Sequence, residues 1–429
     1  DGRIIITGTG NDNFDPATAN SAVLQLPAGK VPTAMTVTNT NEFVLVTVWD
    51  VDQVRGQVAV IAVTNPLMTE QQQRFAGFPG WPQSFGMKLL GFVDLPFAAP
   101  MAIEATVSTR LGNPRGNSDL VGENFNLQAT RDRWNNVPWD VDFGSDYWRQ
   151  TPQSGYALVS SRAEDAVAVI DLRPLFRFHR RMYFTSAANR TQTANVGLAA
   201  NQWPHTFDFA PDQRPQVVRT LSVPQPTAVA TGTRWNTFTV PRSFQQGNND
   251  VRRPLRTAYI ARMDGLVSLF DVGSLIDPAS TANVPSDAFR TFQVGRNPTR
   301  IFRAFHAVNG DDLFVVSRGD RSVTHAEFDG DIRATLIDSR LDDPVHVTVS
   351  FDQAGFGGAG FPNTAYAFVM TVLDFGGKTV HSYLVEDGNN VGGEQWPVRD
   401  ASGRPAPFMY GSGRAVPGRP FANSYDEVI

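Results

Sequence analysis

Short runs of alternating apolar and polar residues fill most of this chain. Val, Ile, Thr, Phe and Tyr dominate these runs, and Gly, Pro, Asn and Asp separate them. Alternation is the pattern of a β-strand with two different faces, and the repeat of an amphipathic helix is scarce. The pattern therefore predicts an all-β protein with many short strands.

A strand that begins with proline recurs along the chain. Proline suits the first residue of a strand, because its missing N–H is tolerated there. The copies read "VPTAMTVTN" (31–39), "APMAIEATVS" (99–108), "QPTAVATG" (225–232), "NPTRIFRAF" (297–305) and "DPVHVTVS" (343–350), with a weaker copy, "WPHTFDFAPD", at 203–212. A repeat of this kind indicates an architecture of equivalent units.

Each good copy is followed by a strand, a polar turn and another strand. These stretches span 42–63, 155–172, 256–272, 311–328 and 365–385, and a sixth at 2–26 opens the chain. A further strand often precedes the next proline, as in "PQVVRTLSVP" and "AFRTFQVGRNP". The repeating unit is therefore four antiparallel strands.

Repeated four-stranded units predict a β-propeller, in which neighbouring sheets cover one another and ring closure leaves only short edges. We expect a single propeller domain over 1–429, with seven blades favoured over six. The seventh blade depends on the weak copy and would lie within 176–220. Because the chain opens on the second strand of a unit, we expect the segment 406–416 to supply the missing strand and close the ring.

The strand–turn–strand stretches "GYALVSSRAEDAVAVIDL" (155–172) and "DDLFVVSRGDRSVTHAEF" (311–328), with the proline-led strands before them, resemble the repeats of YVTN-type and lactonase-like bacterial β-propellers. The resemblance covers most of residues 2–385. It implies a propeller fold, and a function among surface and periplasmic binding proteins or sugar-lactone hydrolases. No insertion matches a catalytic motif of that family, so no catalytic set is carried over.

The tripeptide Arg318-Gly319-Asp320 matches a cell-adhesion signal. The corresponding positions of other units hold "SRAEDA", "ARMDGL" and "VLDFGG", which are also polar and turn-forming. Short motifs match by chance, so we interpret this one as the turn of a hairpin.

Long insertions and a tail interrupt the repeat. The insertions span 65–87, 109–154 and 233–255, and a Gly- and Pro-rich extension spans 388–429. Insertions on a repeat scaffold usually collect on a binding face. The second insertion carries Trp134, Trp139, Tyr147 and Trp148. Aromatic rings beside arginines suit a protein interface or a carbohydrate platform, and the alternative is that the rings pack the loop onto the propeller.

Two acidic stretches are candidate Ca²⁺ sites, because hard cations bind several oxygens of a flexible loop. They contribute Asp12 and Asp15, and Asp140, Asp142 and Asp146. Neither stretch matches an EF-hand, and Asp and Asn also form turns unaided.

First strands of different blades converge on the axis of a propeller. Glu104, Arg300 and His346 lie on such strands, and Asp208 lies on the weaker copy, so they could line one channel mouth. A lactonase-like or other hydrolase working there is the alternative function, supported by fold analogy alone. The chain contains no nucleophile elbow and no phosphate-binding loop.

Composition narrows the function further. The net charge is −5 with no basic stripe, which excludes bulk nucleic-acid binding, and no apolar stretch is long enough to span a membrane as a helix. There is no cysteine, so disulfides and thiolate sites are excluded. Only three of the 37 basic residues are lysines. We interpret this as codon bias, with bidentate arginine pairing as the alternative.

The chain begins with Asp1 rather than Met, which we interpret as a cleaved export signal, with an unseen tag or arm as the alternative. We therefore expect a protein of the periplasm or cell surface. The favoured function is a binding or structural subunit that contacts other proteins through its insertions and tail, rather than an enzyme.

Overall fold

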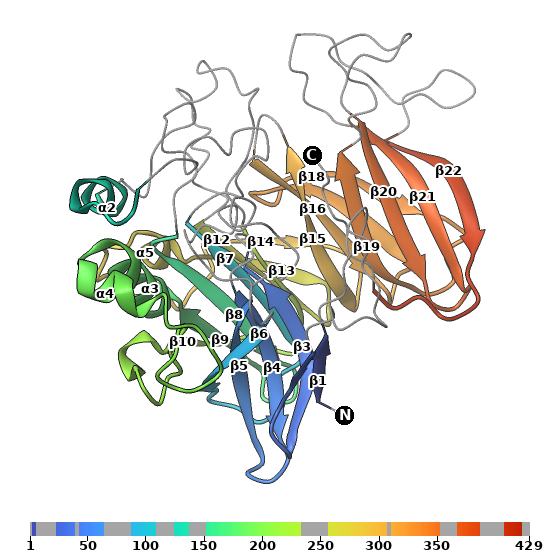
Figure 1. Cartoon of the computed structure of the whole chain (residues 1–429). Coiled ribbons are helices and arrows are strands. Elements are labelled where there is room, and N and C mark those ends of the chain that lie inside the picture. The colour runs from blue at the N-terminus through green and yellow to red at the C-terminus, as the bar shows by residue number, and fades with distance from the viewer. Residues whose placement is uncertain are drawn as a thin grey trace. The chain divides into compact units, whose positions relative to one another are not determined.

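The computed structural model describes residues 2–5, 23–38, 43–63, 87–108, 124–136, 152–232, 256–306, 310–351, 367–386 and 407–422. Within these ranges the chain is an all-β protein (Figure 1). It contains five four-stranded antiparallel sheets and one two-stranded sheet. The all-β class and the four-stranded unit predicted from the sequence are confirmed.

Every four-stranded sheet joins its strands in chain order. The first contains β3 (Lys30–Val37), β4 (Phe43–Asp50), β5 (Arg55–Val63) and β6 (Met87–Asp94). The second contains β7 (Ala102–Val107), β8 (Gly155–Ser161), β9 (Ala166–Asp171) and β10 (Gln216–Ser222). The third contains β11 (Pro226–Thr231), β12 (Thr257–Arg262), β13 (Leu266–Asp271) and β14 (Arg290–Gln293). The fourth contains β15 (Pro298–His306), β16 (Gly310–Ser317), β17 (Ser322–Glu327) and β18 (Ile332–Ile337). The fifth contains β19 (Pro344–Phe351), β20 (Ala367–Asp374), β21 (Thr379–Glu386) and β22 (Phe408–Ala415). The two-stranded sheet pairs β1 (Arg3–Ile5) with β2 (Val23–Gln25).

The chain divides into two compact units. Unit 1 comprises 1–225 and 271–286, and unit 2 comprises 226–270 and 287–429. Unit 1 holds the sheets β1–β2, β3–β6 and β7–β10. It also holds the helices α2 (Gln128–Asn135), α3 (Arg173–Phe184), α4 (Ala187–Gln192) and α5 (Gly273–Ile276), and the short 3₁₀ helix η3 (Pro211–Gln213). Unit 2 holds the other three sheets.

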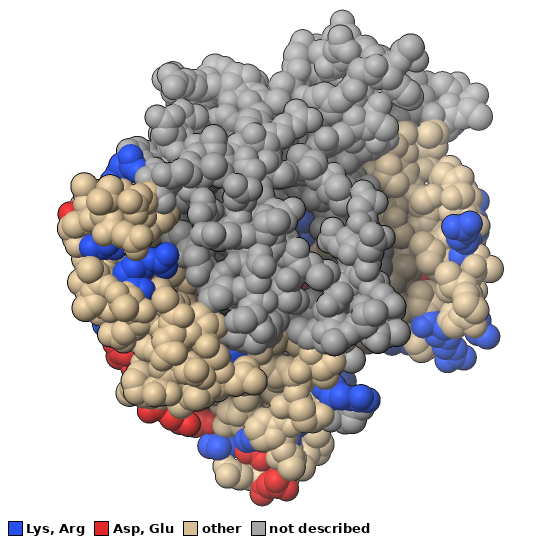
Figure 2. All heavy atoms as spheres, in the orientation of Figure 1, with Lys and Arg blue, Asp and Glu red and all other residues tan. Residues whose placement is uncertain are grey.

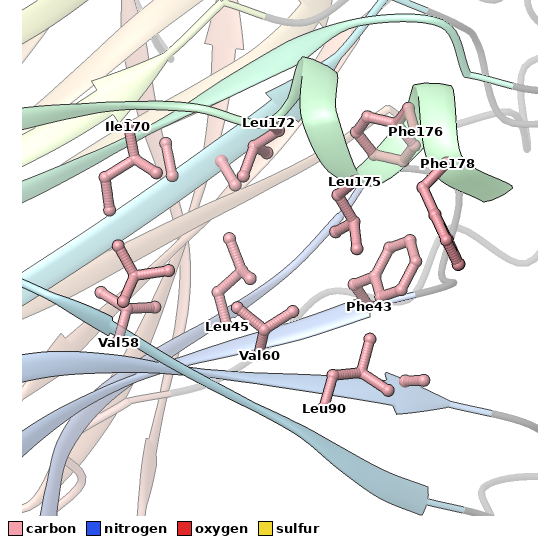
Figure 3. Packing of buried hydrophobic residues seen from close by; sticks show 14 of the residues in the cluster. Phe43, Leu45, Val58, Val60, Leu90, Ile170, Leu172, Leu175, Phe176 and Phe178 are labelled. Carbon is pink, nitrogen blue, oxygen red and sulfur yellow. The ribbon is translucent and has the colours of Figure 1, made fainter. Parts of the chain in front are cut away.

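The core of unit 1 lies between the sheets β3–β6 and β7–β10. Phe43, Leu45 and Val60 point toward Ile170 of the facing sheet and toward Leu175 of α3 (Figure 3). Strands β5 and β8 are buried on both faces, which explains the apolar runs "VAVIAV" of β5 and "YALV" of β8. Burial of these faces is the main stabilising term for the unit.

Unit 2 repeats the same packing with three sheets. Its first strands β11, β15 and β19 lie side by side, β15 in contact with both of the others. A buried cluster around Tyr259 and Leu313 joins the sheets β11–β14 and β15–β18, and one around Phe314 and Tyr383 joins β15–β18 to β19–β22. The Tyr259 hydroxyl donates to the Phe328 carbonyl at 2.7 Å, which satisfies a fully buried polar group.

The proline-led strands are confirmed as the first strands of their sheets. In four of them the register shifts directly after the proline, at Pro32, Pro226, Pro298 and Pro344. A β-bulge accommodates the residue that cannot donate to the ladder.

Two expectations are wrong in detail. Segment 406–416 forms β22, but this strand pairs with β21 as the fourth strand of its own sheet and not with β1 or β2. The weak copy at 203–212 forms no strand. The described part of 176–220 instead contains α3, α4 and η3, with β10 completing the sheet β7–β10. The number of blades in a closed ring, and the single-domain organisation, stay predictions.

The turn between the second and third strands shares one backbone feature in all five four-stranded sheets. The residue before the third strand has a positive φ: Val54, Asp165, Gly265, Arg321 and Lys378. The repeat detected in the sequence therefore extends to a left-handed residue at the same position in every four-stranded sheet. The adhesion-like tripeptide forms this turn between β16 and β17. Arg318 pairs with Asp343, and Asp320 with Arg296, so both charges are engaged within the chain.

Replacing Val54 with glycine should stabilise unit 1. Val54 has φ 50° and is 67% exposed, so its β-branched side chain adds strain and little burial. We expect Val54→Gly to raise the free energy of unfolding by about 1 kcal/mol in denaturant titrations. Val51→Gly, in the same turn and 40% exposed, is the matched control and should lower it. Equal effects of the two changes would contradict the assignment of strain to Val54.

Candidate functional site

A helical layer covers part of unit 1. We define it as α2, α3, α4, η3 and the loop 193–210 (Figure 1). Apart from α2, it is inserted between β9 and β10. Helix α3 has Pro174 in its first turn. It buries Leu175, Phe176, His179 and Tyr183, and the spacing of three or four residues between them is typical of one face of a helix. The Ser186 hydroxyl accepts from the Asn189 N–H and starts α4.

Arginine side chains of α3 connect this layer to neighbouring segments by hydrogen bonds and an ion pair. The buried Arg180 donates to the carbonyls of Trp134 and Asn135 at the end of α2. Arg173 forms an ion pair with Asp171 and donates to the carbonyls of Ser274 and Ser280. Guanidinium groups with several fixed donors suit such multiple contacts. Arginine pairing therefore has a structural role here, whatever the cause of the arginine bias.

Lys88 of β6 fixes the loop 193–210. Its ammonium donates to three backbone carbonyls, those of Gly197, Ala199 and Gln202, each at 2.8 Å. Lys88 is only 3% exposed, and burial lowers its pKa to about 8. An ammonium has three N–H donors, so each one has an acceptor. The loop is thereby held on the sheet β3–β6 as one rigid surface.

An aromatic cluster lies beneath the loop. Trp203 is fully buried, donates from Nε1 to the Tyr183 hydroxyl at 2.9 Å, and packs against His179 and Phe178. Burial lowers the pKa of His179 to about 3, with a smaller contribution from His205. His179 is therefore neutral at pH 7 and is part of the core rather than a proton-transfer group.

The layer carries both exposed apolar and exposed cationic side chains. Leu198 is 69% and Phe209 53% exposed, and the Phe209 ring packs edge-on against His205. Arg133, Arg177 and Arg181 are exposed on α2 and α3. Residues 172–215 contain six Arg and two Asp in a chain of −5. Arg180 is buried and Arg173 pairs with Asp171, so the remaining four Arg and two Asp give a charge of +2. Figure 2 shows Lys and Arg side chains over these helices.

The predicted axial residues lie on first strands, as expected. Glu104 is on β7, Arg300 on β15 and His346 on β19. Glu104 is 8% exposed and its carboxylate accepts from the Thr36 hydroxyl at 3.4 Å, in unit 1. Arg300 and His346 belong to unit 2, where β15 and β19 are in contact. Asp208 lies outside any strand and its side chain is 94% exposed. A shared catalytic site stays a prediction.

The predicted Ca²⁺ ligands Asp12, Asp15, Asp140, Asp142 and Asp146 lie outside the described residues. Among the described residues, Glu327, Asp329 and Asp331 bring three carboxylates within 4.8 Å. Arg290 pairs with both aspartates and Arg333 with Glu327, so arginines already neutralise this group. It therefore carries no metal assignment.

Of the predicted binding aromatics, Trp139, Tyr147 and Trp148 lie outside the described residues. Trp134 is 3% exposed and packs against Phe125, so it anchors α2 in the core. A role for the set in binding stays a prediction. The sequence analysis missed the helical layer and Lys88. The i, i+3, i+4 spacing of "RPLFRFHRRMYF" (173–184) was the available signal.

No protein-family model matches the chain, and no curated protein matches its sequence. Solved structures that it resembles include the β-propeller domain of Cps50 (Swd1) from Myceliophteria thermophila, at 9% identity and a TM-score of 0.38, covering 91% of this chain and 73% of that one. Virginiamycin B lyase from Staphylococcus aureus shares 9% identity at a TM-score of 0.37, and the match covers 97% of this chain and 74% of the lyase chain. A chain of the mitotic checkpoint complex shares 10% identity at a TM-score of 0.40, covering 95% and 74%. Similarity this low carries no argument about function, and membership of the YVTN-type family stays a prediction.

No helix among the described residues is long and apolar enough to cross a membrane.

Proposed function

We propose that this chain is a β-propeller that acts as a binding or structural subunit of a larger protein assembly. Five sheets of identical strand order support the propeller, as do the repeated bulge and the repeated left-handed turn residue. Neighbouring first strands that pack side by side within each unit also fit this architecture. Export to the periplasm or cell surface belongs to the same proposal.

The helical layer carries the binding role. Buried Lys88 and Arg180 bind its backbone carbonyls, and Leu198 and Phe209 are exposed. A rigid surface binds without a large ordering cost, and apolar anchors beside arginines are typical of interface hot spots. Without the buried Arg180 and the Arg173 that pairs with Asp171, residues 172–215 carry a charge of +2, which favours an acidic protein partner. The aromatic insertion and the C-terminal extension would add to this interface.

Purification of the complex from its own source tests the role. We expect native mass spectrometry to show this chain bound to partner proteins. The double change Leu198→Asp and Phe209→Asp should release them, because it places charge at apolar anchors and opposes an acidic partner. Phe289→Asp, at a residue 58% exposed in unit 2, is the matched control and should retain them.

A complex that survives the double change would contradict the assignment to the helical layer. A chain recovered alone would contradict the subunit role. That result would favour the alternative function, a hydrolase that uses Glu104, Arg300 and His346.

A further inference from the structure

A nearly buried histidine lies within the loop 193–210. The His205 side chain belongs to a residue that is 4% exposed, and it packs against three aromatic rings. The distances between ring centroids are 5.5 Å to Trp203, 5.9 Å to Phe178 and 4.8 Å to Phe209. Phe178 belongs to α3, and the other two rings belong to the loop itself. The imidazole therefore connects the loop both to α3 and to the exposed Phe209 ring.

The groups around His205 disfavour a positive charge on its ring. Burial lowers the pKa of His205 below its usual 6.5, and the Lys88 ammonium of β6 lowers it further. His179 of α3 also interacts with His205 and is neutral at pH 7. Arg181 of α3 forms an ion pair with Asp212 of η3, so these two charges neutralise one another. A protonated His205 would therefore be a buried charge beside another positive charge.

The loop is attached to β6 on both sides of His205. On the N-terminal side, the Lys88 ammonium donates to three loop carbonyls between residues 197 and 202. On the C-terminal side, the Phe207 N–H donates to the Leu90 carbonyl at 2.7 Å. Lys88 and Leu90 both lie on β6, so a positive charge on His205 would act on the whole attachment of the loop to this strand.

We propose that the loop 193–210 is an acid-sensitive switch, which opens when the imidazole of His205 takes up a proton. In the closed loop the imidazolium would be buried and repelled by Lys88, whereas in the open loop water hydrates both charges. The closed loop lowers the pKa of His205, so the open loop binds more protons between that lowered value and 6.5. By linkage, the open form gains population as pH falls below 6.5, and the loop is closed above it.

Opening has a consequence for the proposed interface. Leu198 and Phe209, the two exposed apolar side chains assigned to it, both lie in the loop. A loop that leaves β6 would displace both of them, so acid pH should release the partner. This consequence rests on the proposed function, whereas the opening of the loop does not.

Hydrogen exchange of the isolated full chain at pH 7.5 and pH 5.5 tests the switch. The Trp203 and Phe207 amides report it, because they donate to the Asn195 and Leu90 carbonyls in the closed loop. After correction for the intrinsic pH dependence of amide exchange, their opening should rise by up to about tenfold at pH 5.5, since one pH unit below 6.5 permits no more for one group. His205→Phe keeps an aromatic ring that cannot be protonated, and it should abolish the rise.

His381→Phe is the matched control. His381 is also nearly buried, and burial also lowers its pKa, but it belongs to unit 2. This variant should keep the acid response of the loop. The same response in His205→Phe as in the native chain, or unchanged protection of the loop at pH 5.5, would overturn the proposal.

A measurement on the native chain makes the test independent of how the variants fold. The imidazole C–H resonance of His205 should titrate over the pH range in which the loop amides lose protection. A His205 ring that takes up its proton while the loop stays protected would overturn the switch. All these measurements are made without partners, so they succeed or fail whether or not the helical layer binds one.

Discussion

Lys88→Met is expected to lower the free energy of unfolding of unit 1 by about 3–5 kcal/mol, because it leaves several buried acceptors without donors. Three carbonyls accept from this one ammonium, and the methionine side chain can replace none of these bonds. Lys88 is 3% exposed, so water does not take its place without opening the loop. The loop 193–210 should lose its protection in hydrogen exchange before the sheets do.

Thermal unfolding followed by hydrogen exchange and mass spectrometry measures this result for each unit. Lys378→Met is the control, because Lys378 is an exposed lysine in unit 2. It should leave unit 1 unchanged. A loop 193–210 that keeps its protection in Lys88→Met would show that the aromatic cluster alone holds it.

The same lysine gives unit 1 a pH dependence. Burial lowers the pKa of Lys88 from 10.5 to about 8. Between these values the unfolded chain holds the proton and the folded chain has released it. Stability rises with pH where the unfolded state binds more protons, so the contribution of Lys88 to the free energy of unfolding increases from pH 8 to 10.5. The difference between the native protein and Lys88→Met should therefore grow with pH in this window.

The sheets were predictable from the sequence, whereas the conformation of 203–212 in the helical layer was not, for a physical reason. Each sheet repeats one pattern of proline, alternation and turn. The register shifts directly after Pro32 and Pro298 show that the proline forms a β-bulge in the first strand of both sheets. The segment 203–212 shares the proline and part of the alternation. However, Trp203 and Phe207 are buried against α3 and β6 rather than paired in a ladder. A short apolar alternation does not reveal which neighbour covers it.

The position of 406–416 illustrates a second limit. The need to complete the first unit predicted a strand here, and β22 does cover Phe408–Ala415. The predicted partner of this strand, the first unit, was wrong, because β22 pairs with β21. Strand pairing between segments far apart in the sequence is not determined by the local pattern of the strand. Tyr410 selects the edge of β21, where its ring packs on Tyr383 and under the Arg340 guanidinium. Catalytic candidates such as Glu104 were placed on the expected strand, but no sequence pattern states which side chains then meet.

Asp374→Ala is expected to destabilise unit 2 by about 3–5 kcal/mol, as hydrogen bonds to a buried charged group contribute about 1.5–3 kcal/mol each and are not additive. Asp374 is fully buried at the end of β20. Its carboxylate accepts from the backbone N–H groups of Asp342 at 2.9 Å, Asp343 at 2.7 Å and Gly377 at 3.1 Å. It thus joins the β20–β21 turn to the segment that leads into β19. Asp374→Asn, which keeps one acceptor oxygen, should lose about half as much.

The pH dependence of the free energy of unfolding of unit 2 at acid pH tests this prediction. Burial alone would raise the pKa of Asp374, but the backbone donors of Asp342, Gly377 and Asp343 outweigh it and lower the pKa below 3.8. A carboxyl whose pKa is lowered on folding stabilises the fold above its unfolded pKa, and this contribution is lost as pH falls through the folded value. Denaturant titrations of unit 2 should therefore show a weaker pH dependence below pH 4 in Asp374→Ala than in the native protein. Asp208→Ala, at a carboxylate 94% exposed in unit 1, should leave that dependence unchanged. An unaltered acid limb in Asp374→Ala would mean that other carboxyls, such as Asp338, hold the fold together at low pH.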